Sequence, residues 1–197
     1  NLDSGGLLEQ SHKALSPATE VDLIKCGPHH VATSVICGFP AVVNLRANEL
    51  RFPKGSSSYT FATLIELPFM SPAIYELKLD GKSLEVTAAA VVVANSAYFG
   101  GGMKICPDAS TSDGLLDVCV IGDVGKLDLL RSFLKVRTGD HVDHPKVSIF
   151  KASEIEITGT GIIRGDGEQL GELPAKIQIQ RGAINIAGGD NQPPGRG

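Results

Sequence analysis

A short glycine-rich segment late in the chain carries two carboxylates that could do acid–base chemistry. Asp166 and Glu168 stand two residues apart in the run Arg164-Gly165-Asp166-Gly167-Glu168. On an extended chain their side chains would point the same way, and a neighbouring like charge or partial burial can raise the pKa of one carboxyl group. Such a pair is suited to general-base catalysis or to metal-assisted catalysis. A hairpin turn is the other interpretation, because Asp-Gly is a common hairpin dipeptide.

Three consecutive glycines form a second candidate. Gly100, Gly101 and Gly102 follow a long apolar run. Glycine adopts backbone conformations closed to other residues, so a run of glycines can present amide N–H groups to an anion. The glycines are therefore candidate phosphate contacts. A tight connection between two strands is the alternative interpretation.

Three aspartates stand close behind the glycines. Asp108, Asp113 and Asp117 lie among serine and threonine residues, the oxygen-rich setting that Mg²⁺ prefers. Their spacing does not match an EF-hand, and solvated aspartates of turns are the alternative. A metal ion here would need backbone carbonyls beside Asp113, since one carboxylate cannot complete a coordination shell.

The elements that must position these residues are mostly short strands. The chain has 23 glycines, 11 prolines and only 5% aromatic residues, which favours tight turns. We predict a mainly β fold, a two-layer sandwich with two or three helices. Helices are predicted at 56–70 and 126–136, and residues 41–54 carry no clear pattern. Predicted strands are 20–26, 29–39, 73–79, 83–96 with a stretch buried on both faces, 115–122, 147–152, 154–158, 162–168, 175–180 and 183–187.

Composition and charge exclude several classes of protein. A chain of 197 residues with 42% hydrophobic residues is ordinary for a globular protein of one large or two small domains. Its net charge of -4 gives no general attraction for nucleic acid. The four cysteines form no C-x-x-C pair, which favours reduced buried thiols in a cytoplasmic protein. The longest apolar run, 88–94, is too short to span a bilayer, which takes about 20 residues.

The candidate segments resemble motifs of the diacylglycerol kinase catalytic-domain family, which includes bacterial lipid kinases and the sphingosine and ceramide kinases. The resemblance is to its β-rich C-terminal domain and covers about residues 20–187. It rests on N-F/Y-x-x-G-G-G-M, P-x-A-x-x-x-D-G-x-L-D and D-G-E before a proline, matched by Asn95, Tyr98-Phe99, Gly100-Gly101-Gly102-Met103, Pro107, Ala109, Asp113-Gly114, Leu116-Asp117, Asp166-Gly167-Glu168 and Pro174.

The resemblance implies roles for individual residues. Asp166 would be the general base that takes the proton of a lipid hydroxyl as it attacks the γ-phosphate of ATP. Glu168 would be a companion acid, acting through magnesium or the nucleotide. Asp113 would bind a structural Mg²⁺ with the carbonyls of Ser110 and Leu115. The glycines Gly100, Gly101, Gly102 and Gly167 would contact the nucleotide.

The resemblance also has departures. The family's N-terminal domain supplies a glycine-glycine-aspartate-glycine-threonine loop that grips ATP, and this sequence contains no counterpart. Pro40 stands where the family usually has an acid after Gly-Phe. We therefore expect residues 20–187 to be the C-terminal domain of a lipid kinase, inactive without an N-terminal nucleotide-binding domain, with 1–19 as a lead-in and 188–197 as a tail.

The expected partners are a diacylglycerol-like lipid, ATP and the inner face of a membrane, touched peripherally from the cytoplasm. No nucleic acid is expected, and a homodimer stays open. Two alternatives remain: a non-catalytic β-sandwich that binds a lipid or a partner, and a relative of NAD kinase, which shares the architecture.

Overall fold

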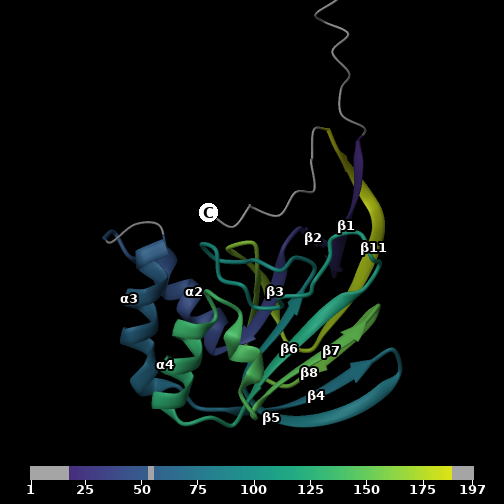
Figure 1. Ribbon diagram of the computed structural model, residues 1–197. Helices are drawn as coiled ribbons and strands as arrows, with labels where there is room; N and C mark the ends of the chain where they lie inside the picture. Colours follow the sequence, from purple (N-terminus) through teal and green to yellow (C-terminus); the bar gives the residue numbers. More distant parts are fainter. Residues whose placement is uncertain (1–17, 53–55, 188–197) are drawn as a thin grey trace, which may run out of the picture.

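Antiparallel strands make up most of the chain, and three helices gather at one side of them (Figure 1). The computed structural model describes residues 18–52 and 56–187, so the predicted tail and all but the end of the predicted lead-in lie outside the described residues. Within these ranges the helices are α2 (Phe39–Glu49), α3 (Ser56–Glu66) and α4 (Lys126–Lys135), with short 3-10 helices η1 (Leu67–Phe69) and η2 (Asp140–Asp143).

The strands form one curved sheet, and every pairing in it is antiparallel. Its order is β10-β9-β3-β5-β4-β8-β11-β1-β2, with β6 beside β5 and β7 beside β6. The mainly β fold with two or three helices is therefore confirmed. The strands are β1 (Thr19–Cys26), β2 (His29–Val31), β3 (Ser34–Gly38), β4 (Ala73–Leu79), β5 (Lys82–Ala94), β6 (Leu116–Gly122), β7 (Val147–Ala152), β8 (Glu154–Thr158), β9 (Ile162–Gly165), β10 (Glu168–Glu172) and β11 (Ala175–Ile186).

Strand β5 is buried on both faces, as predicted. Successive side chains of a strand point to opposite faces of the sheet. Val91 and Val93 accordingly pack into the core between the strands. Ala90, Val92 and Ala94 pack into the core that the helices cover. The second half of β5 lies between β3 and β6, so it forms the centre of the molecule.

The predicted strand 29–39 is in fact two strands. β2 pairs with β1 across the turn at Gly27 and Pro28, whereas β3 lies between β5 and β9. Ala32 and Thr33 lie between β2 and β3 and belong to neither strand. Their backbone N–H groups are therefore available for contacts outside the strands.

Helix α2 occupies a segment for which the sequence predicts no element. It begins directly after β3, and Gly38 at the junction has φ 75°. A Cβ atom at Gly38 would lie 2.6 Å from the carbonyl oxygen of Ala89, so this turn requires glycine. Pro40 stands in the first turn of the helix, where a backbone N–H is not needed.

The outward faces of the helices are more apolar than expected. Helical spacing groups apolar residues on one face of each helix, namely Tyr59, Phe61, Ala62, Ile65 and Leu67 of α3 and η1, and Leu127, Leu130, Phe133 and Leu134 of α4. Phe61, Leu127 and Leu134 are nevertheless 48%, 69% and 64% exposed. Ala62, which belongs to the α3 pattern, is buried, and so is Leu129, which does not belong to the α4 pattern. Both faces of these helices carry large apolar residues, so hydrophobic periodicity does not identify the inward face.

The predicted strands 175–180 and 183–187 are one strand, β11. Gly182 lies inside it with φ 53°, and the pairing with β1 shifts register at the buried Asp22. The Asp22 carboxylate accepts hydrogen bonds from the N–H groups of Gly182 and Gly114, each at 2.8 Å. A bulge of β11 that contains Gly182 and lies opposite Asp22 therefore replaces the turn that the glycine suggested.

Asp80 of the β4–β5 turn should make the folding stability of the protein decrease as the pH falls into the acid range. Its carboxylate accepts hydrogen bonds from the N–H groups of Glu154 and Ser153 and from the Ser153 hydroxyl. The backbone N–H of Glu154 and the Ser153 hydroxyl lower the pKa of Asp80. Bonds to the carboxylate stabilise the fold above the unfolded pKa of about 3.9 and are lost as pH falls through the lower folded pKa.

We therefore expect Asp80→Asn to lower the thermal midpoint near neutral pH, with a difference from the wild type that shrinks below about pH 4. Melting curves of both proteins across pH measure this. A difference that stays constant with pH would contradict it.

Candidate functional site

Asp166 lies in the tight turn between β9 and β10. Asp166 and Gly167 have φ values of 47° and 91°, which is the pattern of a two-residue hairpin turn that Asp-Gly favours. The hairpin interpretation is thus confirmed. The extended-strand geometry that we predicted for Asp166 and Glu168 is wrong, because only Glu168 belongs to a strand.

The break between β2 and β3 binds the Asp166 carboxylate. Oδ2 accepts the N–H of Ala32 at 2.6 Å, and Oδ1 accepts the N–H of Thr33 at 3.0 Å and the Thr33 hydroxyl. A carboxylate offers about four acceptor sites, so these three bonds leave one on Oδ2. The described residues therefore hold the group in place and leave one of its acceptor sites unused, which the role of a general base would need.

Asp166 and the glycine run line one pocket. It has a volume of about 320 Å³, and both Asp166 and Gly100 belong to its lining. The other residues that line it are Thr33, Ser34, Ile36, Asn44, Tyr59, Phe99 and Gly167. The structure thus brings together two segments that the sequence singled out separately.

The glycine run forms a tight loop at the edge of this pocket. Phe99 and Met103 exchange two backbone hydrogen bonds of 2.9 Å, and the three glycines between them have φ values of 46°, 81° and 88°. Gly100 lines the pocket, whereas Gly101 and Gly102 are exposed on the loop. A tight connection is therefore present, and the phosphate contacts stay a prediction.

Glu168 is set apart from this pocket. It begins β10 opposite Gly165, its side chain is exposed, and it is not among the residues that line the pocket. Of the two predicted catalytic carboxylates, the pocket contains only that of Asp166.

A network of polar side chains lies beneath the Asp166-Gly167 turn, and the sequence did not predict it. Arg164, only 5% exposed, donates from Nε to Asn44 Oδ1 at 2.5 Å and from Nη2 to the Gly167 carbonyl at 2.6 Å. Asn48 donates to the same carbonyl at 2.8 Å, and Asn44 donates to the Tyr59 hydroxyl at 3.0 Å. Asn44 and Asn48 share one face of α2 because they are four residues apart. The signal that could have revealed it is an arginine within the apolar strand β9.

Asn95 supports the segment that binds Asp166. Its side chain is fully buried, and Nδ2 donates to the carbonyls of Asp22 at 2.7 Å and Ala32 at 3.0 Å. Its backbone N–H donates to the Thr33 carbonyl at 2.9 Å. Asn95 is therefore a positioning residue, because it holds the two residues whose N–H groups hold Asp166.

An apolar cavity of about 60 Å³ adjoins the polar pocket. It lies between the sheet and the helices α2, α3 and α4, and its lining includes Val43, Leu129 and Phe133. Ile36, Asn44, Tyr59 and Phe99 line both spaces. An elongated molecule with a polar end and an apolar end would find matching surroundings here.

Residues 33–188 match the family described as the YegS C-terminal NAD kinase beta sandwich-like domain. The chain belongs to this family. The match extends through both the glycine run and the Asp166 turn, so the pocket is built from residues of this YegS-type domain.

Known proteins similar to this YegS-type domain carry kinase names. The chain is 36% identical over 157 residues to a diacylglycerol kinase of Mycobacterium tuberculosis, covering 78% of this chain and 50% of that protein. It is 26% identical to a diacylglycerol kinase of Bacillus subtilis, covering 66% of this chain and 44% of that protein. The chain thus spans about half the length of the curated relatives it matches.

A solved structure has the same fold. A crystal structure of a diacylglycerol kinase from Bacillus anthracis superposes with a TM-score of 0.65 at 21% identity. The superposition covers 91% of this chain and 58% of that one. Together with the observed sheet, this confirms the fold that the family resemblance implied.

Asp113, the predicted metal ligand of the YegS-type domain, lies next to Lys151. Asp113 Oδ1 accepts the Leu115 N–H at 3.0 Å, and its Oδ2 lies 3.3 Å from Lys151 Nζ. The buried Asp117 Oδ2 lies 3.3 Å from the same ammonium. Burial raises the pKa of Asp117, and Lys151 offsets part of that effect.

These residues suit a cation chemically, since two carboxylates already share one positive charge. The described residues contain no cluster of three or more histidine, cysteine, aspartate or glutamate side chains suited to a metal. Carbonyl oxygens such as those of Ser110 and Leu115 would therefore have to complete a shell.

Proposed function

We propose that the chain is the acceptor-binding, base-carrying part of an ATP-dependent lipid kinase, which phosphorylates a hydroxyl group of diacylglycerol or a related lipid. The observation that carries this proposal is the free acceptor site on Asp166 Oδ2, in a polar pocket that adjoins an apolar cavity. Membership of a family with relatives named diacylglycerol kinase supports it.

The proposed step is an in-line phosphoryl transfer. The hydroxyl oxygen of the lipid forms a bond to the γ-phosphorus of ATP, and the bond from that phosphorus to the ADP oxygen breaks. Asp166 Oδ2 takes the hydroxyl proton. Because phosphoryl transfer depends mainly on positioning and charge stabilisation, the rigid hold of Ala32 and Thr33 on the carboxylate is the main contribution of this part of the protein.

The apolar cavity is the proposed place of the lipid's hydrocarbon part next to its hydroxyl. Its walls are apolar apart from Asn44, Tyr59 and Thr63. A cavity of about 60 Å³ is narrow for an acyl chain, so the helices that cover it would have to move outward on binding. We expect this movement in α3 and α4, which lie over it.

The nucleotide would approach from the glycine loop. In this proposal the γ-phosphate lies near Gly100 and Gly167, with Gly101, Gly102 and Glu168 towards the rest of the nucleotide or its magnesium. We place the main ATP contacts in the part of the relatives that this chain does not match.

A structural Mg²⁺ at Asp113, with the carbonyls of Ser110 and Leu115, belongs to the same proposal. When bound, it would fix the loop that joins the glycine run to β6. The Lys151 ammonium lies against the same carboxylate and would compete with the ion.

We therefore expect Lys151→Met to raise the affinity for Mg²⁺ by about tenfold, because a competing positive charge is removed from Asp113. Thermal midpoints during Mg²⁺ titration measure this without any activity assay. Lys78→Met is the matched control, because Lys78 pairs with Glu156 elsewhere in the sheet. Equal Mg²⁺ responses in both variants would contradict the proposed site.

Transfer of labelled phosphate tests the function itself. The full-length protein is incubated with ATP labelled at the γ-position and with diacylglycerol, ceramide or NAD as acceptor. Label on a lipid supports the proposal. Label on NAD supports the NAD kinase alternative, and no label on any acceptor from a folded protein that binds lipid supports the non-catalytic alternative.

A further inference from the structure

Most of the large apolar side chains that are exposed among the described residues lie on or beside the helices, and part of this region is named here the outer helical surface. We use this name for the exposed apolar side chains of Phe61 and Leu64 on α3, Phe69 on η1, and Leu127 and Leu134 on α4. They are between 48% and 80% exposed. Val42 and Leu45 of α2 and Phe52 beyond it are also exposed. Single exposed apolar residues are common on proteins, whereas a group of this size marks a contact surface.

This surface is continuous from one helix to the next. Phe61, Leu64 and Pro68 follow one another at helical spacing along α3 into η1, and all three are exposed. The Lys126 ammonium donates to the Pro68 carbonyl, which brings the start of α4 against η1. Val42 of α2 lines a surface hollow together with Phe69. Leu127 and Leu134 then extend the surface by two turns along α4.

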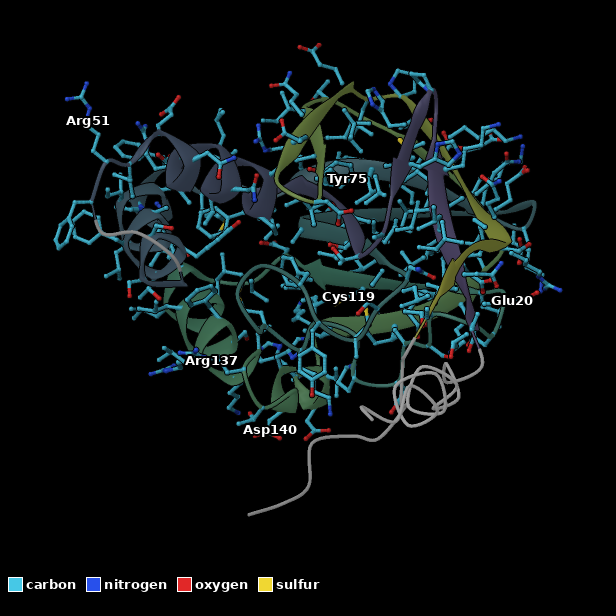
Figure 2. The ribbon with its side chains drawn as sticks, turned by 90° about the horizontal axis from the view of Figure 1, so that it is seen from above. Glu20, Arg51, Tyr75, Cys119, Arg137 and Asp140 are labelled. Atoms are coloured by element: carbon cyan, nitrogen blue, oxygen red, sulfur yellow. The ribbon has the colours of Figure 1, made fainter. Side chains whose placement is uncertain are left out.

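The charge of this region differs from that of the whole chain. Residues 39–52, 56–70 and 125–137 contain six basic and three acidic residues, although the net charge of the chain is -4. Asp123, Asp140 and Asp143 lie just outside these ranges, before and after α4. Figure 2 shows Arg51 and Arg137 projecting outward from the helical side of the molecule, away from Glu20 on the far side. Positive charge around exposed leucine and phenylalanine is typical of surfaces that bind anionic lipid.

The surface also lies beside the proposed lipid site. Helices α3 and α4 present Phe61 and Leu127 outward, and the same helices present Tyr59, Leu129 and Phe133 to the apolar cavity. A lipid that entered the cavity between these helices would come from the side that the outer helical surface faces.

We propose that the outer helical surface docks on an anionic lipid bilayer, with its phenylalanine and leucine side chains in the headgroup and upper acyl region. This inference rests on the proposed function, which makes a bilayer the source of the substrate. Among the described residues, none of the helices has the length and apolar character needed to cross a membrane. Helices α3 and α4 then face the bilayer, and acceptor lipid enters the cavity between them.

Vesicle binding without ATP tests the surface. The full-length protein is sedimented with vesicles of phosphatidylcholine alone or of equal parts phosphatidylcholine and phosphatidylglycerol. We expect binding to the anionic vesicles and at least a tenfold loss in the double variant Phe69→Ser/Leu127→Ser, because each large apolar side chain contributes about a factor of ten when buried. Ile74→Ser is the matched control, because Ile74 is 62% exposed but lies on β4.

A charge variant separates the two contributions. Lys135→Gln/Arg137→Gln should weaken binding to anionic vesicles by about tenfold and leave the weak binding to neutral vesicles unchanged. Equal loss in the Ile74→Ser control, or no vesicle binding by the wild type, overturns the proposal. So does a Phe69→Ser/Leu127→Ser protein that loses its oligomeric state in gel filtration, because the surface would then pack against a second copy.

Detergent-dispersed substrate distinguishes this inference from the proposed function. If the docking surface is correct, the double variant phosphorylates lipid in detergent micelles at the wild-type rate and fails on vesicles. If the proposed function is wrong, no phosphate reaches lipid in either form, while vesicle binding and its loss in the double variant persist.

Discussion

Asp166→Asn is expected to lower kcat for phosphoryl transfer to lipid by about 10²–10⁴-fold in the full-length protein. An amide cannot take a proton from the lipid hydroxyl, so the loss falls on kcat more than on KM. The assay is transfer of labelled phosphate at saturating lipid and ATP, with melting curves of both proteins.

The same substitution has a modest effect on folding. An asparagine oxygen can still accept the Thr33 N–H, but its NH₂ group would face the Ala32 N–H, which is a second donor. The loss of one hydrogen bond and this donor–donor contact should cost about 1–2 kcal/mol. The variant therefore stays folded with a thermal midpoint a few degrees lower.

The chain offers an unusually close control in Asp80. Asp80-Gly81 is also a two-residue hairpin turn, with φ values of 45° and 85°, and its carboxylate likewise accepts two backbone N–H groups and one hydroxyl. Asp80 does not line the pocket. Asp80→Asn should therefore destabilise the protein to a similar degree and leave kcat unchanged. Wild-type activity in Asp166→Asn, or an equal loss in Asp80→Asn, would remove Asp166 from the proposed role.

Asn95→Ala is expected to reduce stability by about 2–4 kcal/mol, because it leaves the carbonyls of Asp22 and Ala32 without their donor. For a domain of this size that corresponds to a fall of about 5–15 °C in the thermal midpoint. Since the loosened segment also holds Asp166, kcat should fall even at temperatures where the variant is fully folded. Melting curves and steady-state assays below the transition measure the two effects separately.

Asn48→Ala is the matched control for Asn95. Asn48 donates one bond to the Gly167 carbonyl, which also accepts from Arg164, and its side chain is exposed. Its loss should cost less than about 1 kcal/mol. Similar thermal midpoints for Asn48→Ala and Asn95→Ala would show that the buried amide of Asn95 is not the support we describe.

Much of the fold follows from local patterns in the sequence. The predicted strands 73–79 and 83–96 on either side of Asp80-Gly81 and the predicted helix at α3 are confirmed, because turn dipeptides and helical spacing act over a few residues. The inward face of α4 could not be predicted, because Leu127 and Leu129 are equally apolar and only packing against the sheet buries one of them.

The candidate site, like the fold, was predicted from the sequence only in part. Motif resemblance drew attention to Asp166 and the glycine run without indicating that Asp166 and Gly100 line the same pocket. Arg164, Asn44 and Thr33 carry no recognisable spacing, and they meet at the turn because β9 pairs with β3 and α2 follows β3 directly. The roles of Asp166, Glu168 and Asp113 stay predictions, and the structure adds that Lys151 faces Asp113.

By itself, the sequence determined the fold class and its principal turns, because these depend on the residue types of short segments. Its motifs also indicated the family. The tertiary structure alone decided that the Ala32–Thr33 break binds the Asp166 carboxylate, and that the outer faces of α3 and α4 stay apolar and exposed. Each of these results from contacts between residues far apart in the chain, and such contacts leave no periodic signal in the sequence.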